Sequence, residues 1–87
     1  MASYRVEVKP SAKKELERLS HQVIAHITRR LEALASNPRP PGCKKLKGGD
    51  KEWRIRVGDY RVVYTIDDQE LLVQATRVRH RSEAYDR

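Results

Sequence analysis

The spacing of hydrophobic residues predicts a strand and then a helix at the start of the chain. Between residues 4 and 9 every second position is hydrophobic, as in a strand with one buried face (Tyr4, Val6 and Val8). Pro10 ends this strand, and the hydroxyl of Ser11 is suited to cap the first turn of a helix. The next hydrophobic residues recur at helical spacing, which predicts a helix over residues 11–19 (Ala12, Leu16 and Leu19).

A second helix and a lysine-rich segment follow. Hydrophobic residues at helical spacing predict a helix over residues 21–35 (Val23, Ile24, Ile27, Leu31 and Leu34). Ser20 and His21 separate the two helices, so we expect a helical hairpin. The prolines between residues 37 and 42 end the second helix. Residues 43–51 combine lysines with two adjacent glycines and predict a basic, mobile loop (Lys44, Lys45, Lys47 and Lys51).

The second half of the chain has the pattern of three antiparallel strands. Hydrophobic residues alternate over residues 53–57 and 60–66, and Gly58 stands where a type II′ hairpin turn favours glycine. Residues 67–69 form another turn, and residues 71–78 have the composition of a central strand. Residues 79–87 are a polar, basic tail. The chain therefore predicts a small two-layer α+β fold with an N-terminal strand, a helical hairpin, a three-strand antiparallel meander and a short C-terminal basic tail or helix.

Length and composition limit the classes of protein. The 87 residues fit one domain, residues 1–87, whose small core leaves no space for a large cofactor. No apolar run approaches the ~20 residues of a membrane span, and the N-terminus lacks the apolar region of a signal peptide. The single cysteine, Cys43, cannot form an internal disulfide, which suits the cytoplasm. The histidines and carboxylates lack the spacing of a metal site, so we expect neither a metal nor another cofactor.

Arginines gather on one face of the predicted hairpin. The formal net charge is +7, and a two-residue loop at residues 58–59 places Arg56 opposite Arg61, with Arg54 on the same face. Like charges opposite each other destabilise a sheet, and arginine suits bidentate contact with phosphate, so the cluster indicates a polyanionic ligand. The alternative is that these arginines pair with nearby carboxylates and only solvate an exposed face (Glu52, Asp59 and Asp67). The opposite face of the hairpin is expected to pack on the helices (Trp53, Ile55, Val57, Tyr60, Val62 and Tyr64).

The basic tail holds the second candidate cluster. His80 lies between Arg79 and Arg81, and these cations are expected to lower the pKa of His80 and favour a neutral base. Tyr85 follows Arg81 by four residues, so one helical turn would place both on one face, where the ring can stack on a base. The alternative is that His80 is a surface residue and Tyr85 packs against the sheet.

Three segments resemble the RelE branch of the RelE/ParE toxin superfamily. They are Gly-Asp-Tyr-Arg-Val-Val-Tyr-Thr-Ile-Asp-Asp (58–68), His-Arg-Ser-Glu-Ala-Tyr (80–85) and Ser-Ala-Lys-Lys-Glu-Leu-Glu-Arg-Leu (11–19). The resemblance covers essentially the whole chain. It implies a type II toxin that cleaves mRNA in the ribosomal A site and is silenced by a RelB-like antitoxin with an acidic segment. It also implies a toxin–antitoxin complex that binds its own operator DNA through the antitoxin.

The resemblance also implies roles for individual residues. Arg54 and Arg56 match two basic strand residues that hold or activate the scissile nucleotide, and Arg61 matches an arginine that stabilises the phosphate. Arg79 or Arg81 matches a basic position in leaving-group chemistry or phosphate binding. Tyr85 matches a tyrosine that stacks on the substrate. Relatives with lysine in the strand have a base there, whereas arginine stays protonated. Arg54 and Arg56 are therefore assigned to transition-state charge, and His80 becomes the candidate general base or acid.

The expected reaction is metal-independent attack of the RNA 2′-OH on the adjacent phosphate, with Arg54, Arg56, Arg61 and Arg81 supplying charge. The loop lysines are expected to bind ribosomal RNA in a salt-dependent manner (Lys44, Lys45, Lys47 and Lys51). We expect Arg61→Ala to reduce cleavage more than Arg30→Ala on the second helix. Two alternatives stay open: a ParE-like toxin that poisons DNA gyrase, and an inactive module that binds antitoxin or RNA. The tail residues favour RNA chemistry over gyrase binding (His80, Arg81 and Tyr85).

Overall fold

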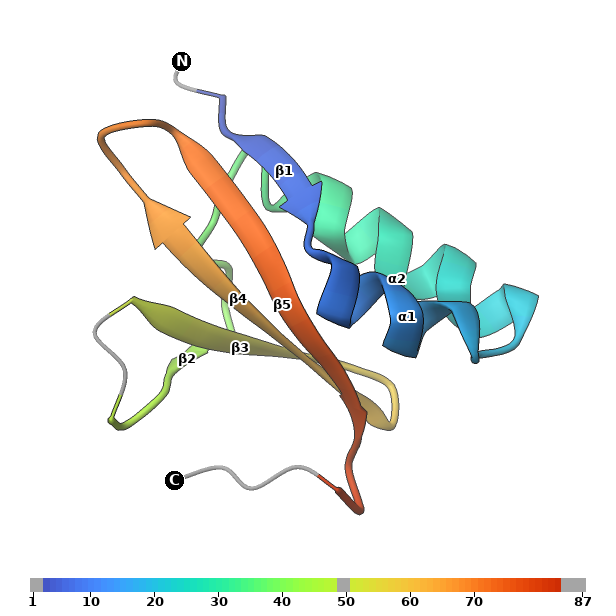
Figure 1. Cartoon of the computed structure of the whole chain (residues 1–87). Coiled ribbons are helices and arrows are strands. Elements are labelled where there is room, and N and C mark those ends of the chain that lie inside the picture. The colour runs from blue at the N-terminus through green and yellow to red at the C-terminus, as the bar shows by residue number, and fades with distance from the viewer. Residues whose placement is uncertain (1–2, 49–50, 84–87) are drawn as a thin grey trace.

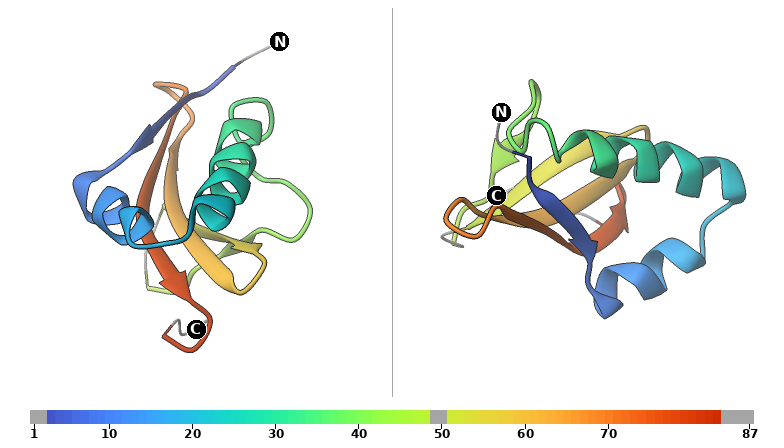
Figure 2. Two further views of the ribbon diagram at one scale, coloured as in Figure 1. Left: turned by 90° about the vertical axis from the view of Figure 1, so that its right-hand side faces the viewer. Right: turned by 90° about the horizontal axis from the view of Figure 1, so that it is seen from above.

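A strongly twisted sheet carries two helices on one side (Figures 1 and 2). The computed structural model describes residues 3–48 and 51–83. Its elements, in chain order, are β1 (Arg5–Val8), α1 (Pro10–Glu17), α2 (His21–Ala33), β2 (Lys44–Lys45), β3 (Glu52–Val57), β4 (Tyr60–Asp67) and β5 (Leu72–His80). The α+β class, the helical hairpin and the three-strand meander predicted from the sequence are confirmed.

The sheet has the order β1-β5-β4-β3-β2. β1 pairs with β5 in parallel, and the other neighbouring strands are antiparallel. The β3–β4 hairpin has the predicted register, with Val57 opposite Tyr60 and Arg56 opposite Arg61. Gly58 has φ +60°, whereas Asp59 keeps a negative φ, which is the combination of a type II′ turn. The turn therefore fixes which face of the hairpin each side chain occupies.

The core lies between the sheet and the helices. α2 contributes its apolar stripe, and β3, β4 and β5 contribute alternate residues (Ile27, Leu31, Ile55, Val57, Val62, Tyr64, Ile66, Val73, Ala75 and Val78). Tyr64 is fully buried, and its hydroxyl donates to the Pro38 carbonyl at 2.7 Å. Burial raises the pKa of Tyr64. This bond fastens the proline-rich segment after α2 to the middle of the sheet.

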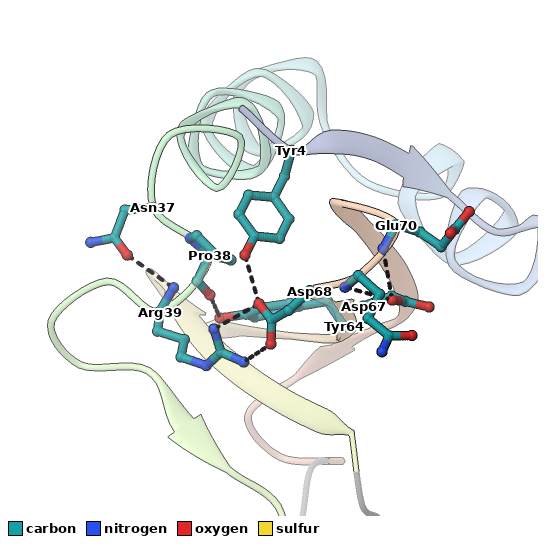
Figure 3. Close-up of polar contacts among 9 residues, drawn as sticks. Tyr4, Asn37, Pro38, Arg39, Tyr64, Asp67, Asp68 and Glu70 are labelled. Carbon is teal, nitrogen blue, oxygen red and sulfur yellow. Dashed lines mark hydrogen bonds and ion pairs between the residues drawn. The ribbon is translucent and has the colours of Figure 1, made fainter. Parts of the chain in front are cut away.

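A polar clamp holds the same segment at the far end of β4 (Figure 3). Arg39 donates to both carboxylate oxygens of Asp68, at 3.2 and 2.9 Å, and the Tyr4 hydroxyl donates to Asp68 at 2.6 Å. The Arg39 guanidinium also lies 5.1 Å from the centroid of the Trp53 ring. Hydrogen bonds from Arg39 and Tyr4 hold the pKa of Asp68 below its ordinary value. The clamp joins the start of β1, the proline-rich segment and the β4–β5 turn.

The segment predicted as a loop over residues 43–51 contains a short strand, so that prediction is wrong in part. In β2, Lys44 pairs with Arg54 and Lys45 with Trp53. The Leu46 N–H donates to the Glu52 carbonyl at 2.9 Å and closes the connection to β3. A two-residue edge strand made of lysines has no hydrophobic alternation, and its pairing depends on β3 rather than on its own sequence.

Two other boundaries differ from the prediction. The N-cap of α1 is Lys9, without a side-chain cap bond, and the Ser11 hydroxyl donates to the Thr76 carbonyl of β5 at 2.7 Å. β5 runs to His80, so Arg79 and His80 are strand residues and not part of a tail. Ser20 does cap α2 by accepting a hydrogen bond from the Val23 N–H. Over residues 3–48 and 51–83, neither helix has the length and apolar character that a membrane span requires.

Candidate functional site

Three arginines form one row across three strands. Arg56 in β3 lies opposite Arg61 in β4, and Arg61 lies opposite Arg79 in β5. Residues that are directly opposite in a sheet share a face, so the three side chains leave the sheet on the same side. This face is opposite to the one that packs on the helices, because Val57 and Val62 beside them are buried in the core. We call these three residues the arginine row.

Arg54 shares the face of the arginine row but is only 3% exposed. It stands between Lys44 of β2 and Val63 of β4, so a strand flanks it on each side. Arg56 lies beyond the end of β2 and is exposed, and Arg61 is half-buried. The open arginine face expected from the hairpin alone is therefore wrong at Arg54, because β2 covers this residue and no hydrophobic pattern indicates β2.

A cationic pocket of about 400 Å³ adjoins the arginine row at the edge of β3. Its lining residues come from α2, the segment before β2, β2 itself and β3 (Arg30, Pro41, Gly42, Cys43, Lys44, Arg54 and Arg56). Arg30 is fixed there, since its Nη1 donates to the Arg56 carbonyl at 3.3 Å. Sequence reasoning treated Arg30 as a remote position, so Arg30→Ala is not a neutral comparison for Arg61→Ala. Only the α2–β3 contact reveals this residue, and no local pattern signals it.

Glu15 is a second residue that sequence reasoning missed. Its carboxylate accepts a hydrogen bond from the Val78 N–H at 2.8 Å and contacts Arg77 at 3.1 Å and Arg79 at 3.5 Å. β1 pairs with β5 only as far as Ala75, so Glu15 of α1 takes over the edge of β5 where β1 has ended. It thereby holds one end of the arginine row beside α1.

His80 lies on the other face of the sheet from the arginine row. It pairs with Tyr60, and the two rings make an edge-on contact with centroids 5.3 Å apart. His80 Nδ1 lies 3.2 Å from the Ser82 amide nitrogen and 2.9 Å from the Ser82 hydroxyl oxygen. The structure thus brings Arg79 to the arginine row and places His80 away from it.

The other predicted residues that the structure describes do not gather at one place. Arg81 is exposed, its N–H donates to the Asp59 carbonyl at 2.7 Å, and its side chain lies 3.9 Å from the Asp59 carboxylate. Tyr85 lies outside the described residues. The predicted RNA-binding lysines are all exposed, but only Lys44 lines the cationic pocket, whereas Lys45 and Lys51 line a separate hollow beside Trp53 (Lys44, Lys45, Lys47 and Lys51). Within the described chain, no group of three or more histidine, cysteine or acidic side chains is arranged to hold a metal ion.

Comparison with known proteins identifies relatives over nearly the full length. Residues 6–85 match the family described as the ParE toxin of the type II toxin–antitoxin system parDE. The chain is 30% identical over 87 residues to a protein of Methanocaldococcus jannaschii named as the toxin RelE1, with 94% of each chain covered. It is also similar to the RelE–RelB complex of Pyrococcus horikoshii, with a TM-score of 0.82, 25% identity and coverage of 94% of this chain and 99% of that one. The RelBE2 toxin–antitoxin complex of Mycobacterium tuberculosis gives a TM-score of 0.81 and 28% identity, with 95% and 97% covered.

Proposed function

This chain belongs to the RelE/ParE superfamily of type II toxins, and from that premise we propose that it is a ribosome-dependent endoribonuclease that cleaves mRNA in the A site. The observation that carries the proposal is the arginine row of Arg56, Arg61 and Arg79, with the cationic pocket beside it. Three guanidinium groups on one sheet face concentrate positive charge, and they suit a ligand with closely spaced negative charges. A phosphodiester backbone has this property.

The proposed reaction needs no metal. The RNA 2′-oxygen bonds to the adjacent phosphorus while the bond from phosphorus to the 5′-oxygen breaks. Water takes the proton of the 2′-OH and gives one to the departing 5′-oxygen, so the products are a 2′,3′-cyclic phosphate and a 5′-OH. Negative charge builds up on the oxygens around the phosphorus as the first bond forms and the second breaks. Preorganised donors aimed at such charge each contribute on the order of 10²–10³ in rate, which is the role we assign to the arginine row.

We propose that the ribosome aligns the reacting atoms of the mRNA, which the sheet face alone does not do. A twisted sheet face can present charge but cannot by itself force the 2′-oxygen, the phosphorus and the 5′-oxygen into line. We propose that the A site holds the mRNA in this geometry, and that the lysines of the β2 region outside the cationic pocket bind ribosomal RNA (Lys45, Lys47 and Lys51). Tyr85 is proposed to stack on a base of the substrate and Arg81 to contact a phosphate.

A RelB-like antitoxin is the proposed protein partner. Two similar structures are toxin–antitoxin complexes by name, and a chain with a formal net charge of +7 suits a partner with an acidic segment. We propose that this complex binds its own operator DNA through the antitoxin and that the toxin acts in the cytoplasm.

The experiment uses purified toxin, ribosomes paused with a defined codon in the A site, and primer extension on the mRNA. New 5′ ends within that codon that require phosphorylation before ligation support the proposal. Intact mRNA under conditions where the toxin is bound contradicts it.

A ParE-like action on DNA gyrase is the second candidate, because the matching family is described as the ParE toxin. The same preparation is tested for inhibition of gyrase supercoiling. Inhibition of supercoiling together with intact mRNA assigns the chain to that branch.

A further inference from the structure

The cationic pocket is built by parts of the chain that are far apart in sequence. Arg30 comes from the last turn of α2, Lys44 from β2, and Arg54 and Arg56 from β3. The wall between α2 and β2 is formed by residues 41–43. Among the lining residues that the structure describes there is no carboxylate, and the four charged ones are all cations.

Arg30 brings a charge from the helix layer to the pocket, whose other charged lining residues come from strands β2 and β3. Its half-buried side chain crosses from the helix layer to the edge of β3 and donates one hydrogen bond to the Arg56 carbonyl. The bond sets the position of the guanidinium, which carries several further N–H donors for a ligand. A preorganised arginine loses less side-chain entropy on binding than a mobile one.

We propose that this pocket binds a backbone phosphate of the RNA strand adjacent to the scissile phosphate, with Arg30 and Lys44 as its specific binding residues. This inference rests on the proposed function, because Arg56 both lines the pocket and belongs to the arginine row. The two positions therefore adjoin, as neighbouring phosphates of one strand require. Arginine forks favour phosphate, which they contact through two parallel hydrogen bonds.

The test measures binding of a short fluorescein-labelled RNA oligonucleotide whose 2′-O-methyl riboses prevent cleavage. Arg30→Gln and Lys44→Gln are each compared with a residue of equal charge outside the pocket, Arg29→Gln on the same helix as Arg30 and Lys13→Gln on α1. Arg29 and Lys13 are exposed and do not line the pocket. We expect each pocket variant to lose about tenfold in affinity, as for one hydrogen bond to a charged group. The plot of log affinity against log salt concentration has a negative slope, which should become shallower by about 0.7 for each lost phosphate contact.

Unmodified protein provides a second measurement that does not depend on the folding of variants. Titration with the same oligonucleotide should shift the amide NMR signals of Gly42 and Cys43, which line the pocket, and leave those of α1 in place. Equal loss of affinity in all four variants, or unchanged Gly42 and Cys43 signals, overturns the proposal. The proposal is also overturned if Arg30 and Lys44 contribute to the binding of an acidic peptide of Asp and Glu but not to the binding of RNA, since this result assigns the pocket to a protein partner.

The cleavage assay separates this inference from the proposed function. Arg30→Gln should raise KM on programmed ribosomes about tenfold and leave kcat nearly unchanged, because the pocket binds without taking part in bond breaking. If wild-type toxin leaves ribosomal mRNA intact while oligonucleotide binding still depends on Arg30, the pocket stands and the proposed function fails. If wild-type toxin cleaves but the Arg30 and Arg29 variants bind equally, the pocket fails and the function stands.

Discussion

Glu15 provides the sharpest test of how the sheet is held, because one carboxylate serves three groups of β5. The Glu15 carboxylate accepts a hydrogen bond of 2.8 Å from the Val78 N–H, at the part of the β5 edge that β1 does not reach. It also contacts the side chains of Arg77 and Arg79. Val78 is only 5% exposed, so water cannot readily replace the lost acceptor. Glu15→Ala removes the acceptor and the charge together, whereas Glu15→Gln keeps an oxygen for the Val78 N–H.

The magnitude follows from these contacts. Leaving a buried N–H without an acceptor costs about 1–3 kcal/mol. The side chains of Arg77 and Arg79 are 45% and 37% exposed, and solvent screening limits such ion pairs to about 0.2–1 kcal/mol. We therefore expect Glu15→Ala to lower the free energy of unfolding by about 2 kcal/mol and Glu15→Gln by less than about 1 kcal/mol.

The assay is urea unfolding followed by Trp53 fluorescence, with the thermal midpoint as a second readout. A loss of 2 kcal/mol corresponds to about 8–16 °C in Tm for a domain of this size. Glu17→Ala, on the exposed side of the same helix, is the matched control. A Glu15→Ala variant as stable as Glu17→Ala, or a Glu15→Gln variant as unstable as Glu15→Ala, would refute the reasoning that the Val78 N–H needs this acceptor.

Three further outcomes are expected. Arg79→Ala should slow cleavage by about 100-fold or more and His80→Ala by less than about tenfold, since only Arg79 shares the arginine row; equal losses in a single-turnover assay contradict this. Tyr64→Phe should cost about 1–2 kcal/mol in urea unfolding, because the Pro38 carbonyl loses its buried donor, and an unchanged midpoint counts against it. Asp68→Asn should lower Tm at neutral pH, and the difference from wild type should shrink below about pH 4. The reason is that the pKa of Asp68 is lower in the folded protein, so its carboxylate stabilises the fold above its ordinary pKa, and this stabilisation is lost as the pH falls and the carboxylate is protonated. A constant Tm difference across that range contradicts the last expectation.

Local signals were sufficient for the elements whose structure is set locally. The alternation over residues 53–66 and the glycine in the turn predicted the β3–β4 register correctly, and Ser20 marked the start of α2. The same reasoning failed at Ser11, because a serine hydroxyl satisfies a distant carbonyl as readily as a helix N-terminus, and Thr76 is visible only in the folded chain.

Long-range pairing explains the rest. β2 exists because β3 offers it an edge, and the burial of Arg54 depends on β2 in turn. Arg30 and Glu15 reach the site from the two helices, at polar positions that no periodicity distinguishes from solvated ones. The extension of β5 to His80 places that histidine on the opposite face of the sheet from Arg79, since side chains alternate along a strand.

The most direct test of the account is the single-turnover rate of A-site cleavage on programmed ribosomes for Arg56→Gln, Arg61→Gln and Arg79→Gln, beside the control Arg29→Gln. Each variant of the arginine row is expected to lose at least about 100-fold in the rate of the chemical step at saturating toxin. Arg29→Gln should cleave at the wild-type rate. Cleavage by all four variants at one common rate would contradict the claim that the arginine row performs the chemistry.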